Sequence, residues 1–149
     1  ALDRSRMREL VFADAQAKKS LEGLLHPMIR AEVALQMAAV GDAAAKGATA
    51  PYIVLVVPLL IETGAYCNLA RRVLVVDCDE HQQVTRVIQR SGLTAEAVRA
   101  IMASQVSRAH RLEHADDVVR NDGDLAALRS AVEALHLKYL GLARKPAGM

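Results

Sequence analysis

The chain has 149 residues, which suits one globular domain with a single core. Hydrophobic residues make up 52% of the sequence, and its formal net charge of +2 is too small for a dense basic face that binds duplex DNA. Aromatic residues are only 3%, so stacking platforms for single strands are also scarce. We therefore expect no nucleic-acid partner.

The sequence also gives no sign of a membrane partner. Its longest apolar run, from Tyr52 to Ile61, has ten residues, whereas a membrane helix needs about 20. Charges from Asp3 onward leave no apolar signal core, so no secretory signal is expected. Cys67 and Cys78 form no CxxC pair, which favours free thiols in a reducing compartment. These features predict a cytoplasmic protein.

Two helices are expected in the first 50 residues. Asp3 can cap a helix whose apolar face begins at Met7. A long helix over residues 26 to about 48 follows, with Pro27 in its first turn. Its apolar stripe recurs at steps of four and three: Leu25, Ile29, Val33, Met37 and Val40.

Three apolar, β-branched segments predict strands. Residues 52–58 (YIVLVVP) and 72–78 (RVLVVDC) read as parallel strands covered on both faces, and the residues between them suffice for a short helix and a crossover. Residues 116–121 (DDVVRN) predict a brief third strand before a turn. Strands that alternate with helices predict an α/β fold with a parallel sheet.

Four more helices are expected after the second strand, three of them before the third strand. Asp79 can cap one of these, with Gln82 completing a capping-box-like pair and Gly92 ending it. Thr94 and Ser107 can cap two short, charge-rich helices, which we interpret as a mobile flap. A stripe at steps of three and four predicts an amphipathic closing helix: Leu125, Leu128, Val132, Leu135, Tyr139 and Leu142.

The carboxyl ends of the predicted strands are candidate ligand sites, because open parallel sheets bind ligands there. These ends are residues 58–62, 77–79 and 121–123. Pro58 lacks a ladder donor and releases the chain into a loop, where three apolar residues form a wall beside Glu62. An ordinary strand end with a surface acid is the alternative interpretation.

Five arginines gather in the flap: Arg86, Arg90, Arg99, Arg108 and Arg111. Arg86 shares a helical face with Arg90, and Arg108 with Arg111, so their guanidinium forks can converge on phosphate oxygens. A solvated charged face is the alternative. A phosphate-cradling GxxxxGK(S/T) loop is not found, because none of the five lysines follows a glycine.

Residues 110–114 (HRLEH) match the HxxEH pattern of inverted zinc proteases. His110 and His114 are one helical turn apart, with Glu113 between them. A third ligand cannot be named from the sequence, and ordinary surface histidines are the alternative. A metal hydrolase is therefore our weakest hypothesis, and no residue is assigned to a metal.

Eight sequence blocks resemble bacterial dephospho-coenzyme A kinases, in order and over essentially the whole chain: 2–12, 24–30, 52–62, 72–78, 87–90, 104–112, 115–123 and 135–140. The resemblance implies a three-layer parallel sheet of the P-loop nucleoside monophosphate kinase type, with a helical substrate region and a lid. It implies transfer of the ATP γ-phosphoryl, with Mg²⁺, to the ribose 3′-hydroxyl of dephospho-coenzyme A, the last step of coenzyme A synthesis.

The resemblance also implies how one domain, 1–149, is organised. Residues 1–50 would be the helical substrate-binding region, 51–80 with 115–149 the nucleotide-binding core, and 81–114 the lid. The family's first strand, phosphate loop and catalytic base would precede residue 1, so we expect a longer parent protein. The alternative is a non-catalytic fragment or binding module of a P-loop kinase. A monomer or weak homo-oligomer is expected.

Site residues are carried over from the resemblance position by position. The implied substrate-binding residues are His26, Pro27, Pro58, Leu59, Leu60 and Glu62. The implied catalytic residues are the lid arginines Arg90, Arg108 and Arg111, which face the phosphates. The implied nucleotide contacts are Asn121, Gly123 and again Arg111. The acid that often follows the lid arginine is replaced here by Ser91.

Overall fold

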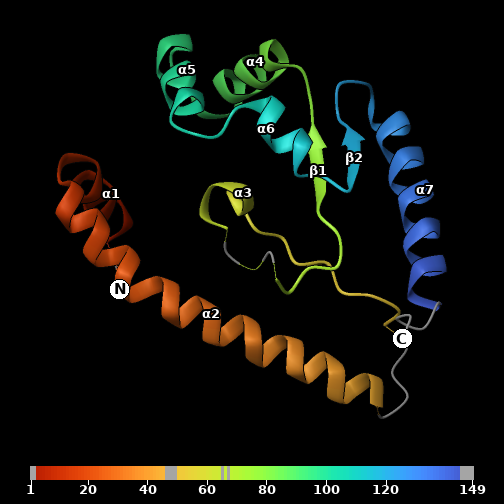
Figure 1. Cartoon of the computed structure of the whole chain (residues 1–149). Helices are drawn as coiled ribbons and strands as arrows, with labels where there is room; N and C mark the ends of the chain where they lie inside the picture. Colours follow the sequence, from red (N-terminus) through yellow and green to blue (C-terminus); the bar gives the residue numbers. More distant parts are fainter. Residues whose placement is uncertain (1–2, 46–49, 65, 67, 145–149) are drawn as a thin grey trace. The chain divides into compact units, whose positions relative to one another are not determined.

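The computed structural model describes residues 3–45, 50–64, 66 and 68–144 (Figure 1). The chain divides into two compact units, Ala1–Ala50 and Pro51–Met149. Within the described ranges, no helix has the length and the apolar character needed to cross a membrane.

The first unit opens with α1 (Arg4–Ala13), which begins where the sequence predicts. The side chain of its N-cap, Asp3, accepts a hydrogen bond from the backbone N–H of Arg6 at 2.9 Å. Met7 is half-buried, whereas Leu10 is exposed. The expected apolar face of α1 is therefore covered only in part.

The second helix, α2 (Ala15–Ala45), begins eleven residues before the predicted start. Asp14 caps it, because its carboxylate accepts from the backbone N–H of Gln16 at 2.7 Å. Pro27 lies inside the helix rather than in its first turn, so that prediction is wrong. A proline there costs about 3 kcal/mol, and the strong helix formers on either side offset this cost. The predicted end at 46–48 lies outside the described residues.

The second unit contains a parallel two-stranded sheet, and its strands β1 (Leu74–Asp77) and β2 (Asp117–Arg120) lie side by side in Figure 1. Their register pairs Leu74 with Asp117 and Asp77 with Arg120. Two predicted strands are thereby confirmed, both somewhat shorter than expected. The register brings the carboxyl ends of both strands to one edge, which positions the candidate site.

The predicted strand at 52–58 is not formed, and among the described residues this segment pairs with no strand. The expectation that both its faces are covered is also wrong, since Val56 is 83% exposed and Val54 is exposed too. Apolar β-branched residues favour a strand, yet a strand exists only where a neighbour supplies ladder hydrogen bonds. Tyr52 anchors the segment, because its ring packs edge-on against Tyr139 with 5.6 Å between centroids.

Five helices complete the described part of the second unit: α3 (Leu60–Thr63), α4 (Glu80–Ser91), α5 (Ala95–Ala103), α6 (Arg108–Glu113) and α7 (Leu125–Arg144). The helix caps predicted for three of them are confirmed. Asp79, Thr94 and Ser107 accept from the backbone N–H groups of the following residues, in order: His81, Ala97 and His110. Asp124 caps α7 in the same way through the N–H of Ala127.

The two ends of α4 differ in how well they were predicted. Gly92 ends the helix as expected, because its φ of 66° is left-handed and its N–H donates to Ile88 O. The capping-box role of Gln82 is wrong. Its Nε2 donates instead to Asp122 O at 3.0 Å, which ties α4 to the loop after β2.

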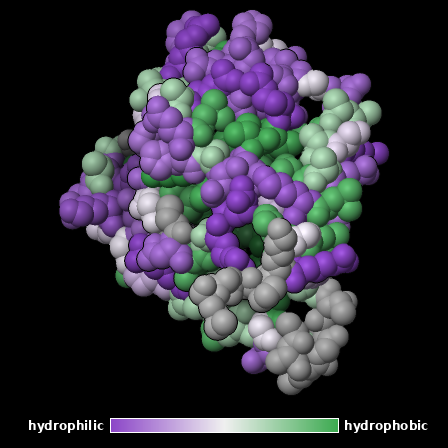
Figure 2. Space-filling model, turned by 45° about the vertical axis from the view of Figure 1, so that its right-hand side comes forward, coloured by the Kyte–Doolittle hydropathy of each residue, from purple (hydrophilic) through white to green (hydrophobic). Residues whose placement is uncertain are grey.

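The closing helix α7 lies beside β2 (Figure 1) and contacts it. Of the predicted stripe, Leu128, Leu135 and Tyr139 are half-buried, while Leu125 and Val132 are exposed. Figure 2 shows hydrophobic surface (green) between hydrophilic residues (purple) on one face of the molecule. The stripe is therefore only partly used to cover the sheet.

The adjacent residues Val119 and Val118 on β2 make a matched test of this packing. Val119 is 3% exposed and Val118 is 43% exposed, because side chains of a strand alternate between its faces. We expect Val119→Ala to lower the free energy of unfolding by about 1 to 2 kcal/mol and Val118→Ala by less than about 0.5 kcal/mol. Urea unfolding of both variants measures this, and equal losses would contradict the burial pattern.

Candidate functional site

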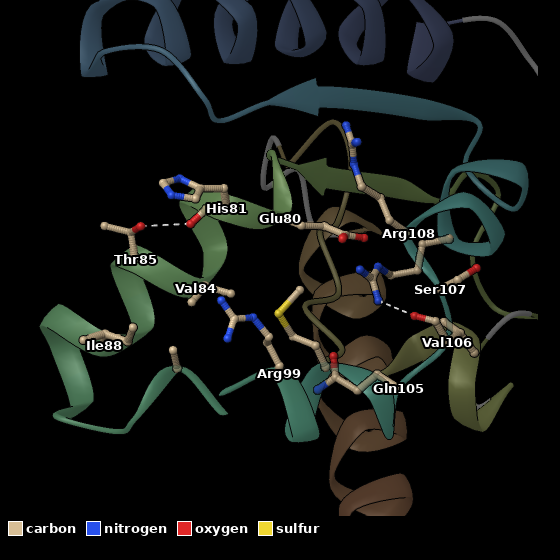
Figure 3. A pocket seen from close by; sticks show the side chains of 13 residues that line it. Glu80, His81, Val84, Thr85, Ile88, Arg99, Gln105, Val106, Ser107 and Arg108 are labelled. Carbon is tan, nitrogen blue, oxygen red and sulfur yellow. Dashed lines mark hydrogen bonds between the residues drawn. The ribbon is translucent and has the colours of Figure 1, made fainter. Parts of the chain in front are cut away.

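A cavity of about 600 Å³ lies among α4, α5 and α6 (Figure 3). It is lined by side chains of both polar and apolar character: Glu80, His81, Val84, Thr85, Ile88, Ala95, Arg99, Met102, Gln105, Val106, Ser107, Arg108 and Arg111. Three of the five arginines noted in the sequence are thus at one cavity. Arg86 and Arg90 are exposed on α4 and do not line it.

Arg111 is held at this cavity by a hydrogen bond within its own segment. Its Nη1 donates to the backbone carbonyl of Val106 at 2.7 Å, and its side chain is half-buried. Arg99 comes from α5 and projects into the cavity (Figure 3). Two guanidinium groups from different helices therefore face one space, an arrangement that suits a phosphate group.

Arg108 has a different role from Arg111, because its guanidinium is bound to Asp77 at the end of β1. Nε and Nη2 of Arg108 each donate to one carboxylate oxygen of Asp77 at 2.7 Å. Asp77 is 4% exposed, and Arg120 Nη1 donates to it at 3.0 Å. The Arg108 fork, with the charge of Arg120, holds the pKa of Asp77 below its ordinary value. This ion cluster fastens the first residue of α6 to the sheet.

The loop after β2 is held against the same strand end. The backbone N–H of Asn121 donates to Asp77 O at 2.7 Å, and Arg86 Nη1 donates to Asn121 O at 2.5 Å. At Gly123 an added Cβ would meet Ala127 Cβ at 3.4 Å, so the loop lies close to the start of α7. Asn121 and Gly123 lie at the predicted strand end, outside the set of cavity-lining residues.

The implied acceptor residues of the second unit lie on and around α3. Leu59 has a left-handed φ of 60°, which is costly for a residue with a Cβ, and its carbonyl accepts from Thr63 Oγ1 at 2.9 Å. Leu60 and Glu62 are half-buried, whereas Pro58 is exposed. None of these residues lines the cavity.

His26 and Pro27 belong to the first unit, where both are exposed on α2. Their role in substrate binding stays a prediction.

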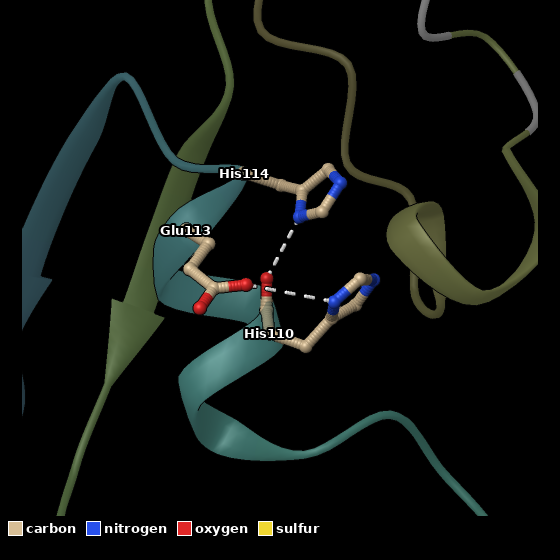
Figure 4. A group of neighbouring side chains, drawn as sticks. All are labelled: His110, Glu113 and His114. Carbon is tan, nitrogen blue, oxygen red and sulfur yellow. Dashed lines mark hydrogen bonds and ion pairs between the residues drawn. The ribbon is translucent and has the colours of Figure 1, made fainter.

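The HxxEH residues come together on α6 and its C-cap (Figure 4). Possible ligand atoms of His110, Glu113 and His114 all lie within 4.8 Å of one another. The third ligand that the sequence left open is still unassigned, because among the described residues this group holds only the three residues of the pattern. All three side chains are exposed.

A second buried carboxylate, Asp117, ties the start of β2 to its surroundings, and sequence reasoning missed it. Asp117 is 7% exposed and accepts from Arg72 Nε at 2.7 Å, from Tyr139 Oη at 3.1 Å and from Lys138 Nζ. The Arg72 hydrogen bond and the other two donors lower the pKa of Asp117 to about 2. Burial and the bond to Asp117 raise the pKa of Tyr139 to about 12.

This cluster predicts a loss of stability in acid. The pKa of Asp117 is about 2 in the folded chain and near its ordinary 3.8 when unfolded, so its stabilisation is complete above about pH 4 and is lost as pH falls towards 2. We expect a loss of roughly 1 to 2 kcal/mol, since the exposed parts of Arg72 and Lys138 screen the interaction.

Urea unfolding between pH 6 and pH 2 measures this loss, with Asp117→Asn as the comparison. The variant should start less stable and lose less in acid. If the Asp117→Asn variant lost as much free energy of unfolding between pH 6 and pH 2 as the wild type, this role of Asp117 would be contradicted.

The fold and the cavity define an α/β protein with parallel strands, in which arginines gather beside the strand ends. This is a class of site suited to phosphorylated ligands. A family model described as dephospho-CoA kinase matches residues 1–127. The chain belongs to the dephospho-CoA kinase family.

Individual relatives agree with this assignment. The chain is 50% identical over 144 residues to the dephospho-CoA kinase of Nitrosospira multiformis, covering 97% of this chain and 68% of the relative. It is 52% identical to that of Chromobacterium violaceum, covering 94% and 65%. It is also similar to the structure of dephospho-CoA kinase from Campylobacter jejuni, with a TM-score of 0.65, 31% identity and coverage of 95% and 67%. The chain thus spans about two thirds of the length of these relatives.

Proposed function

We propose that this chain is the lid-bearing and acceptor-binding part of a kinase that phosphorylates dephospho-coenzyme A with ATP. The single observation that carries the proposal is the cavity in which Arg99 and Arg111 face one space beside the strand ends. Family membership supplies the acceptor and the donor, because the matched relatives are named dephospho-CoA kinases.

In the proposed reaction the ribose 3′-hydroxyl oxygen attacks the γ-phosphorus of ATP. The bond from that phosphorus to the bridging oxygen of ADP breaks, a new O–P bond forms, and the hydroxyl proton is released. Phosphoryl transfer of this kind depends mainly on positioning and on neutralising charge. Arginines that hold the transferred phosphoryl group would therefore contribute more to the rate than a single general acid or base.

We assign separate roles to the lid arginines. Arg111 contacts the phosphates directly, because it lines the cavity and keeps guanidinium N–H groups beyond the one bonded to Val106. Arg108 acts through Asp77, since both ends of its fork are bound to that carboxylate. Arg90, in the last turn of α4, is proposed to reach the phosphates only when nucleotide is bound.

The remaining carried-over residues complete the proposed substrate contacts. Asn121 and Gly123 contact the adenine side of the nucleotide. The acceptor contacts are the set implied by the resemblance: His26, Pro27, Pro58, Leu59, Leu60 and Glu62.

The cavity fits the phosphates of ATP better than it fits Mg²⁺. Its arginines offer donors that match phosphate oxygens. Among the described lining residues, Glu80 is the single carboxylate, whereas Mg²⁺ favours an octahedral set of oxygen ligands. We therefore propose that Mg²⁺ travels with the nucleotide, and we assign no residue of the described ranges to it.

We also propose the finer architecture of a three-layer parallel sheet of the P-loop kinase type, in a cytoplasmic protein. The three-layer architecture is supported by exposed apolar residues: Val54, Val56 and, on β1, Val76. Such surface is normally covered by a further strand or helix. A non-catalytic binding module is the second candidate function. It is favoured by the sequence, in which no phosphate loop of the GxxxxGK type is found.

The test is an assay of a protein of the relatives' full length that contains this chain. Mixed with dephospho-coenzyme A, ATP and Mg²⁺, it should release ADP and yield coenzyme A, measured by mass spectrometry. Adenosine without the pantetheine arm is the control acceptor and should react far more slowly. Turnover only with another acceptor would move the assignment to a different small-molecule kinase, and no turnover with any acceptor would favour the binding module.

A further inference from the structure

The side chains of His110 and His114 project together from one turn of α6 and its C-cap (Figure 4). Their ring centroids are 4.3 Å apart and their planes are tilted by 49°. Both rings are exposed, so an ion can reach them from solvent without displacing packed side chains. The cluster is not used by the kinase reaction proposed above.

Each ring has an acceptor facing its Nδ1 atom. His114 Nδ1 lies 2.8 Å from the backbone carbonyl oxygen of His110, a hydrogen bond in which the ring nitrogen must be the donor. His110 Nδ1 lies 3.8 Å from a carboxylate oxygen of Glu113, within ion-pair distance. The carbonyl holds a proton on Nδ1 of His114, which leaves the Nε2 lone pair of that neutral ring free. The Glu113 carboxylate lies beyond hydrogen-bond distance of His110 and sets no tautomer there.

This arrangement is the one that supports metal ligation by histidine. Metal-bound histidines almost always direct their second ring nitrogen to a carboxylate or a backbone carbonyl, which sets the tautomer and orients the ring. Here the His110 carbonyl occupies that outer position for His114, and Glu113 lies within ion-pair distance of His110 Nδ1. Imidazole ligands suit Zn²⁺, Cu²⁺ and Ni²⁺, whereas Mg²⁺ favours oxygen.

We propose that His110 and His114 form a two-histidine chelate for a divalent transition-metal ion such as Zn²⁺, with Glu113 as the outer carboxylate. Water completes the coordination shell, since the group is open to solvent. The ion would link the last turn of α6 to its C-cap. Arg111 lies on the same helix, so the chelate would stabilise the helix that carries the proposed phosphate-binding arginine.

Zn²⁺ titration of the full chain by calorimetry tests the proposal, with millimolar Mg²⁺ present throughout. We expect one Zn²⁺ per chain at micromolar concentrations. His110→Gln and His114→Gln should each weaken binding by about tenfold or more. Glu113→Gln should weaken it less, because the Glu113 carboxylate is exposed and lies 3.8 Å from His110 Nδ1. In nitrogen NMR spectra of the wild-type protein, Zn²⁺ should shift Nε2 of His114 more than its Nδ1.

Two variants serve as controls. His26→Gln removes an exposed histidine of the first unit, and Cys78→Ser removes a thiol that could itself bind Zn²⁺. Both should bind Zn²⁺ like the wild type. The proposal is overturned if Zn²⁺ fails to bind at millimolar concentration, or if the two histidine variants bind as tightly as the controls, which would mean adventitious binding elsewhere. Neither result bears on kinase activity, so the two proposals fail separately.

Discussion

Replacing Arg111 by lysine in a full-length kinase that contains this chain should lower turnover about 10³-fold, the scale seen for arginines that stabilise phosphoryl-transfer charge. Arg111 donates one N–H to Val106 O and keeps others for the cavity. A lysine carries its donors on a single nitrogen and cannot present a planar fork to two phosphate oxygens. The effect should fall mainly on kcat, because the charge is neutralised most strongly in the transition state.

Arg129→Lys is the matched control, since Arg129 is exposed on α7 and does not line the cavity. Its turnover should equal that of the wild type. Thermal unfolding should be nearly unchanged for both variants, which separates loss of chemistry from loss of fold. An Arg111→Lys enzyme with the wild-type rate would show that Arg111 belongs to a solvated charged face, and the roles proposed for the lid arginines would then be wrong.

Asp77→Asn should lower the free energy of unfolding by about 2 to 4 kcal/mol, because removing one partner of a buried ion pair leaves the other charge without compensation. Asp77 accepts both ends of the Arg108 fork and a further hydrogen bond from Arg120. An amide offers one acceptor oxygen, and its NH₂ group would face a guanidinium donor. We expect a loss at the lower end of this range, because the Arg120 side chain is 55% exposed and its guanidinium can be solvated in the variant.

Urea unfolding at pH 7 measures the effect, and Glu133→Gln on the exposed side of α7 provides the control with a loss below about 0.5 kcal/mol. Because the pKa of Asp77 is lowered by Arg108, the wild-type advantage should shrink as pH falls below the ordinary carboxylate range. An Asp77→Asn protein as stable as the control at neutral pH would mean that the ion cluster contributes no net stability.

Asp77 also bears on how the lid could be held in place. It ends β1, and its bond to Arg108 fixes the residue with which α6 begins. Arg111 lies three residues further along the same helix. We therefore expect Asp77→Asn to displace Arg111 at the cavity as well as to lower the free energy of unfolding. A raised KM for ATP with a smaller change in kcat would distinguish this positioning role from direct contact with phosphate.

Local signals in the sequence were enough to locate most helix starts and two of the strands. Asp3, Asp79, Thr94 and Ser107 were predicted as caps and act as caps. A cap depends on one side chain and the N–H groups two or three residues away, so it needs no distant partner. The family could also be recognised from sequence, because block order and spacing are properties of the chain alone.

The start of α2 shows where such signals compete. Proline at position 27 favours a helix start there, although Asp14 offers an earlier cap before a run of good helix formers. Proline inside a helix is costly but not prohibitive, so its position alone could not set the boundary. Asp14 followed by alanine and glutamine was the available signal.

Contacts between distant segments were beyond the reach of the sequence. The composition of residues 52–58 favours a strand, yet a strand forms only where another segment completes its ladder, and among the described residues none does. The five arginines could not be sorted in advance, because a guanidinium fits a buried carboxylate and a phosphate equally well. The register of β1 and β2 and the position of α6 assign Arg108 to Asp77 and leave Arg111 at the cavity, since each pairing depends on which groups the fold brings within hydrogen-bonding distance.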